Sequence, residues 1–130
     1  MPYDGMTLLV LLFAGTGLLA TGLSIPLIRR RVPPNALYGL RSDAALDGPD
    51  VWYDANARSG RDLGLFGVLT AVCAVVLPLL LDMTPGSYGL AMTALTAGGA
   101  TVLCAAGWRR AKRLRADASK RRDENKASFT

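Results

Sequence analysis

The chain has 130 residues, with 15 lysines and arginines, 10 aspartates and glutamates and no histidine, so its formal net charge is +5. Hydrophobic residues make up 51% of the sequence and charged residues only 19%, which is unlike an ordinary soluble domain. The missing histidine excludes histidine-based acid–base catalysis, histidine metal sites and histidine-containing triads.

The charged residues leave three long apolar runs free, namely 5–28, 63–81 and 83–108. Each run exceeds about 18 residues, the length at which an α-helix can cross the apolar part of a bilayer. The sequence therefore predicts an all-α membrane protein with a three-span membrane domain over 1–108 and a basic cytoplasmic tail over 109–130. The predicted spans and the cytoplasmic loop between the first two are about 6–28, 62–82, 87–108 and, for the loop, 29–61.

All 15 cations lie in two segments, six in the loop and nine in the tail. Three spans place both segments on one side of the membrane, and the other side carries only Asp4 and Asp82. The positive-inside rule then predicts an external N-terminus and a cytoplasmic C-terminus. A cleaved signal peptide is the alternative interpretation of the first run, but it requires cations before the run, whereas Arg29, Arg30 and Arg31 follow it.

The basic tail favours the lipid bilayer as a partner and not nucleic acid. Five cations follow Trp108 within seven residues, where anionic headgroups lie. We therefore expect no direct binding of nucleic acid. We expect the third helix to continue for a turn or two past Trp108, and the chain from about Asp117 to be disordered because it is polar and mixed in charge.

Small residues predict where the helices touch, because helices in lipid associate through close approach. The expected contact rows are Gly89, Thr93, Ala97, Thr101 and Ala105 in the third span, Thr16, Ala20 and Ser24 in the first, and Gly60, Gly64 and Gly67 in the second. These rows predict a bundle, with the contacts made within one chain or between chains of a homo-oligomer or larger membrane complex.

The cytoplasmic loop carries the most specific pattern. Pro33 and Pro34 predict a stiff turn that Asn35 can cap or close. Pro49 marks the start of a short amphipathic helix to about Ser59. Because Trp52 on this helix suits the headgroup level, we expect the helix to lie along the inner membrane surface.

Three polar or aromatic residues of the loop are candidates for a site. Trp52 and Asn56 are four residues apart and share a helical face, and Arg41 precedes that helix. Together they could bind a peptide, a headgroup or a carboxylate. Alternatively, they fasten the loop to the bundle through hydrogen bonds and a cation–π contact.

These residues resemble the signature of the SdpI family of bacterial multi-pass membrane proteins. The resemblance consists of a Pro-Pro-Asn turn, a Tyr-Gly-Leu-Arg-Ser segment, a tryptophan, an asparagine four residues later and a glycine. It implies motif positions at Asn35, Gly39, Arg41, Trp52 and Asn56, and a location in the bacterial plasma membrane. It also implies a role in immunity or signalling, with a toxin peptide or a transcriptional repressor as the partner.

Two other functions stay open: a structural or assembly subunit of a larger membrane complex, and a conduit for lipids or small molecules. The conduit is the weaker of the two, because no span has an ionisable group in its interior. No nucleophile–base pair can be assembled, so we expect no enzymatic activity, no catalytic residue and no cofactor. Cys73 and Cys104 are isolated within spans, and we expect no metal site.

Overall fold

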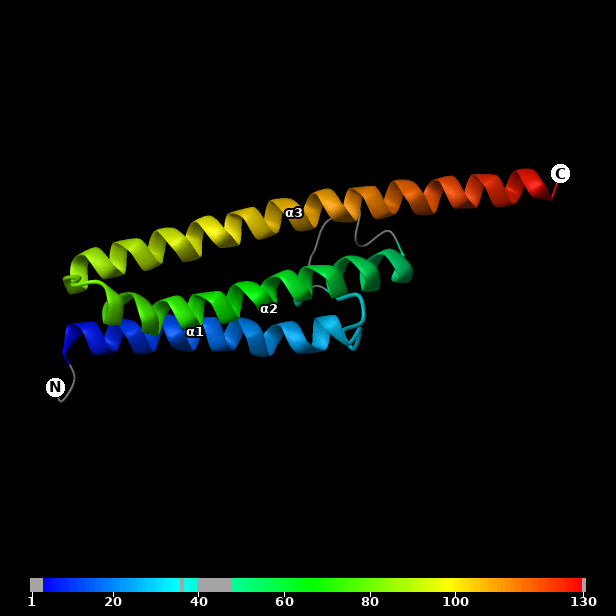
Figure 1. The fold of residues 1–130 in the computed structure, drawn as a ribbon. Helices are drawn as coiled ribbons and strands as arrows, with labels where there is room; N and C mark the ends of the chain where they lie inside the picture. The colour runs from blue at the N-terminus through cyan, green and yellow to red at the C-terminus, as the bar shows by residue number, and fades with distance from the viewer. Residues whose placement is uncertain (1–3, 36, 40–47, 130) are drawn as a thin grey trace.

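A computed structural model describes residues 4–35, 37–39 and 48–129 of the chain. It contains three helices, α1 (Gly5–Ile28), α2 (Pro49–Leu80) and α3 (Pro85–Ser128), which run side by side (Figure 1). All three are long and apolar enough to cross a membrane by their length and composition. The described residues contain no strand, so the prediction of an all-α protein with three apolar helices is confirmed.

Local sequence signals explain where the helices begin. The Asp4 side chain accepts a hydrogen bond from the Thr7 amide at 2.8 Å and caps α1. Thr84 caps α3 in the same way by accepting from the Ser87 amide at 3.3 Å. Proline occupies the first turn of both α2 and α3, where its missing N–H costs nothing.

The loop does not form the separate interfacial helix that we expected. The predicted start at Pro49 is right, but the helix continues through Gly60 without a break as part of α2. A Cβ on Gly60 would lie 2.8 Å from the Cβ of Leu27 on α1. The glycine at this position therefore allows two helices to approach each other, and does not mark a turn onto the membrane surface.

The expectation of a disordered tail from Asp117 is also wrong. In Figure 1 α3 continues well past the end of α1, and it remains helical to Ser128. Beyond the apolar run, Ala111 is fully buried and Leu114 packs beside it against the first turns of α2. This apolar contact supports the first part of the extension, although the segment as a whole is highly charged.

The glycines of α2 form a close contact with α1. A Cβ on Gly17 of α1 would lie only 2.5 Å from the Gly67 carbonyl oxygen, and one on Gly64 would lie 2.7 Å from the Ser24 hydroxyl. The predicted contact row of α2 is therefore confirmed. On α1 the contact includes Ser24 as predicted, but it passes through Gly17, while Thr16 is exposed.

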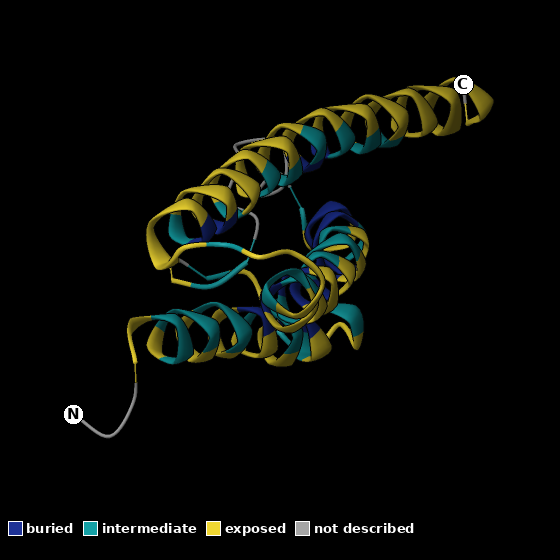
Figure 2. Cartoon of the chain, turned by 60° about the vertical axis from the view of Figure 1, so that its left-hand side comes forward, coloured by how far each residue is buried: buried dark blue, intermediate teal, exposed yellow. Residues whose placement is uncertain are grey.

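The predicted contact row of α3 is wrong within this chain. Its four members beyond the intermediate Gly89 are exposed, namely Thr93, Ala97, Thr101 and Ala105. The helix instead packs through a stripe that includes the buried residues Tyr88, Met92 and Gly107. Most of the α3 surface is consequently exposed (Figure 2). Small residues occur on every side of α3, so their spacing did not identify the face that packs through Tyr88 and Met92.

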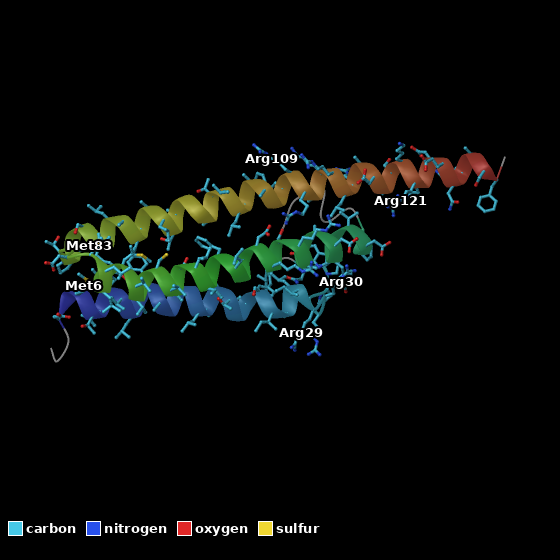
Figure 3. The ribbon with its side chains drawn as sticks, in the orientation of Figure 1. Met6, Arg29, Arg30, Met83, Arg109 and Arg121 are labelled. Atoms are coloured by element: carbon cyan, nitrogen blue, oxygen red, sulfur yellow. The ribbon has the colours of Figure 1, made fainter. Side chains whose placement is uncertain are left out.

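Two clusters of buried residues lie at opposite ends of the bundle. One contains Ala74, Tyr88 and Met92, with Met6 and Met83 packed around it. The other contains Trp52, Ala55 and Ala111. Figure 3 shows Met6 and Met83 at one end and Arg29 and Arg30 toward the other, which we call the cationic end.

Candidate functional site

The candidate site lies at the cationic end, where the chain leaves α1 and approaches α2. The amide of Arg30 donates to the Leu27 carbonyl at 3.1 Å, and that of Arg31 donates to the Pro26 carbonyl at 3.0 Å. Arg30 has a φ of 55° in the left-handed region, where a residue other than glycine costs about 1 kcal/mol. This reversal turns the chain toward α2, and the Arg30 guanidinium meets the Asp54 carboxylate at 2.6 Å.

Asn35 organises the turn that follows the two prolines. Its side-chain oxygen accepts hydrogen bonds from the amides of Leu37 at 2.8 Å and Tyr38 at 2.7 Å, while its side-chain nitrogen donates to the Pro33 carbonyl at 2.8 Å. The prediction that Asn35 caps or closes this turn is confirmed. The turn leaves the Leu37 side chain 94% exposed.

Tyr38 fastens the turn to α1, a role that the sequence did not reveal. Its hydroxyl donates a hydrogen bond to the Leu23 carbonyl oxygen. A tyrosine hydroxyl is protonated at neutral pH and can donate this bond, and burial raises the pKa of the Tyr38 hydroxyl further. Leu23 lies one residue after Gly22, whose carbonyl loses its helix partner because Pro26 has no N–H.

Trp52 joins the loop to both α2 and α3. It has no exposed surface, and its indole nitrogen donates to the Val32 carbonyl at 2.9 Å. Ala55 and Ala111 share its cluster, with Leu114 packed beside it. The α3 extension therefore covers the Trp52 ring, which packs within the protein and does not face the lipid headgroups.

Gly39 and Asn56 complete the arrangement. Gly39 has a φ of 106°, and a Cβ there would lie 2.6 Å from the Asn56 side-chain oxygen and 3.3 Å from Trp52. Asn56 is 2% exposed, and its side-chain nitrogen donates to the Trp52 carbonyl at 2.9 Å. Only glycine meets both the backbone and the space requirements of this contact.

We call the group formed by Val32, Asn35, Gly39, Trp52 and Asn56 the loop junction. Four of the five predicted site residues belong to it, and the fifth, Arg41, lies outside the described residues. Sequence reasoning missed the contributions of Val32, Tyr38 and Ala111. Ala111 and Leu114 could have been found, because two apolar residues three apart within a charged helix indicate a packed face.

The polar side chains of the loop junction bond to the backbone of the same chain. Trp52 and Asn56 are buried and their indole N–H and amide N–H groups are bound to main-chain carbonyls. No group of three histidine, cysteine, aspartate or glutamate side chains in the described part of the chain could hold a metal ion. The buried motif residues therefore favour the interpretation that they hold the loop against the bundle.

The comparisons with known proteins bear on the same segment. The model of the SdpI/YfhL protein family matches residues 31–108, which include the whole loop junction, the spanning part of α2 and the apolar part of α3. No curated protein and no solved structure matches the chain. The family model covers well over half of the sequence, and the chain is therefore a multi-pass membrane protein that belongs to the SdpI/YfhL family.

Proposed function

We propose that this chain is a non-enzymatic immunity or signal-sensing protein of a bacterial plasma membrane. It binds a membrane-active toxin peptide or a regulatory partner, and its cationic end faces the cytoplasm. The single observation that carries the proposal is the loop junction. There the family-matched segment connects the end of α1, the first turns of α2 and the extension of α3.

The loop junction holds the described part of the loop against all three helices. Val32 follows α1, Trp52 belongs to α2 and Ala111 belongs to α3, and the three meet around one buried indole. A peptide that changes the helix packing within the membrane would therefore change the position of this loop. Such coupling is what a sensor requires, because a ligand acts through a difference between two arrangements.

Leu37 is the residue that supports a contact with a regulatory partner. It is almost completely exposed, and it projects from a turn that Asn35 fixes by hydrogen bonds to the amides of Leu37 and Tyr38. An apolar side chain on an ordered turn is suited to docking, since little conformational entropy is lost on binding. The buried Trp52 and Asn56 would then act as positioning residues for this turn.

Growth of a susceptible bacterial strain, with and without the gene, tests the proposal. The cells are challenged with the peptides secreted by the organism that encodes the chain. We expect the gene to raise the peptide concentration that inhibits growth. Equal sensitivity of both strains would contradict the immunity role. If a foreign membrane protein also copurified stably after gentle detergent extraction, a structural subunit would be favoured instead.

Leu37→Asn separates partner binding from folding. We expect this variant to fold normally and to bind a regulatory partner more weakly. Phe129→Asn is the matched control, because Phe129 is 87% exposed but lies at the far end of α3. Equal effects of the two substitutions on partner capture would argue against the turn as a docking surface.

A further inference from the structure

A cavity of about 410 Å³ lies between α2 and α3 at the cationic end, apart from the loop junction. It is lined by four arginines, one aspartate and two apolar residues, among them Arg58, Arg109, Arg110, Arg113, Asp117 and Leu114. Four guanidinium groups around one cavity form an electrostatic environment that favours an anion. We call it the arginine pocket.

The charges of the arginine pocket are only partly balanced within the described residues. Arg110 donates to the Asp62 carboxylate at 2.7 Å. The other ion pair within 4 Å in the described ranges joins Arg30 to Asp54, so no described carboxylate lies within that distance of Arg58, Arg109 or Arg113. One aspartate, Asp117, cannot neutralise three guanidinium groups, and the pocket keeps a positive charge.

The arginine pocket lies where the apolar parts of the three helices end. A Cβ on Gly60 would lie 3.1 Å from the backbone nitrogen of Ile28, so this part of α2 is level with the end of α1. The ion pair between Asp62 of α2 and Arg110 of α3 shows that Arg110 lies at the same level. Arg109 lies on α3 near that level, past the last apolar residue of the span (Figure 3). The pocket therefore begins at the membrane boundary.

Exposed apolar side chains continue from the pocket toward the middle of the membrane. Leu65 lies seven residues after Arg58 on α2, and Val102 lies seven residues before Arg109 on α3. Seven residues are nearly two helical turns, so each apolar side chain shares a face with its arginine. Leu65 is 63% exposed and Val102 is 66% exposed. A ligand held by the arginines would contact this apolar surface if it also carried an acyl chain.

We propose that the arginine pocket binds the phosphate-bearing headgroup of an anionic phospholipid, with the acyl chains against Leu65 and Val102. Guanidinium groups hold phosphate oxygens through paired charge-assisted hydrogen bonds. Basic pockets beside membrane helices at the anionic leaflet are suited to such headgroups. The bound lipid would fill the space between α2 and α3 and fix the angle at which the α3 extension leaves the membrane.

The test measures lipid binding to the full chain in phosphatidylcholine nanodiscs, titrated with phosphatidylglycerol and followed by native mass spectrometry. The pocket variant carries Arg109→Gln and Arg113→Gln. The control variant carries Arg61→Gln and Lys112→Gln, which removes two charges near the same depth from residues that do not line the pocket. All four side chains are exposed, and we expect both variants to keep the helical circular dichroism of the original chain.

We expect the pocket variant to bind phosphatidylglycerol at least about tenfold more weakly than the control variant, since it loses paired hydrogen bonds in addition to charge. Arg109→Lys with Arg113→Lys should fall between them, because lysine keeps the charge and loses the paired geometry. Equal weakening of the pocket and control variants would overturn the proposal in favour of diffuse attraction. Displacement of the lipid by sn-glycerol 3-phosphate at a similar concentration would overturn it in favour of a soluble phosphate ester.

Discussion

The Tyr88 hydroxyl donates a hydrogen bond at 2.9 Å to the carbonyl oxygen of Ala74, which is the carbonyl that Pro78 leaves without its helix partner. Proline has no N–H, so the residue four positions before it loses an acceptor bond. No water is available in the apolar core of a membrane to replace that bond. Tyr88 of α3 therefore compensates for a break within α2, while its ring meets Phe13 of α1 edge to face.

Tyr88→Phe should lower the free energy of unfolding by about 1 kcal/mol, since it leaves a buried carbonyl without a donor. Unfolding of the reconstituted chain in sodium dodecyl sulfate, followed by circular dichroism, measures the change. Pro78→Ala restores a backbone N–H, so adding it to Tyr88→Phe should recover most of the loss. If the two effects simply added, the proposed compensation would be wrong.

Trp52→Phe should lower the free energy of unfolding by about 1–2 kcal/mol. The substitution keeps an aromatic ring in the buried cluster but removes the N–H that bonds to Val32 and leaves a gap beside Ala111. Trp108→Phe is the control, because Trp108 is 55% exposed. An equally small effect of both substitutions would contradict the role of Trp52 in fastening the loop.

Gly39→Ala should displace the loop from α2. The new Cβ meets the Asn56 side chain, and a φ of 106° is strained for alanine, at a cost of about 1–3 kcal/mol. Faster proteolytic cleavage between α1 and α2 would report the displacement. Gly48→Ala makes no such contact and has an extended φ of −175°, so its cleavage rate should stay close to that of the original chain.

Gly17→Ala should separate α1 from α2, because the added methyl group would collide with the backbone of Gly67 and Ala71. We expect a loss of about 1–3 kcal/mol in the free energy of unfolding. Gly15 lies two residues away on the same helix with nothing within 4 Å of an added Cβ. Gly15→Ala should therefore be neutral or stabilising, and a comparable loss there would refute the close contact at Gly17.

The Asp4 cap predicts that the stability of the start of α1, at the end of the bundle away from the cationic end, depends on pH. Hydrogen bonds from the Thr7 side chain and backbone lower the pKa of Asp4 below its ordinary 3.8. The ionised carboxylate therefore stabilises the helix start above pH 3.8, and the contribution is lost as the pH falls through the lowered pKa. A carboxyl-carbon NMR titration should give a midpoint below 3.8, and Thr7→Val should move that midpoint upward. An unchanged midpoint in the variant would show that Thr7 is not the cause.

The helices could be predicted from the sequence because the absence of charge over 18 residues leaves few alternatives in a membrane. Asn35 was also predictable, since its side chain acts on amides within three residues. The continuity of α2 was not, because Gly60 suits a turn and a close helix contact equally well. The burial of Trp52 was missed for a related reason: the residue that covers it, Ala111, is 59 positions away in an otherwise charged segment.

The length of α3 has a mechanical consequence. From Tyr88, which is fixed by its contacts with Ala74 and Phe13, the helix continues without a break to Ser128. At about 1.5 Å per residue this rod is about 60 Å long. A tilt of about 5° around the tyrosine would move the far end by about 5 Å, so a small displacement at one membrane surface becomes a large one beyond the other. Because Ala111 of α3 packs against Trp52, such a tilt would also disturb the loop junction.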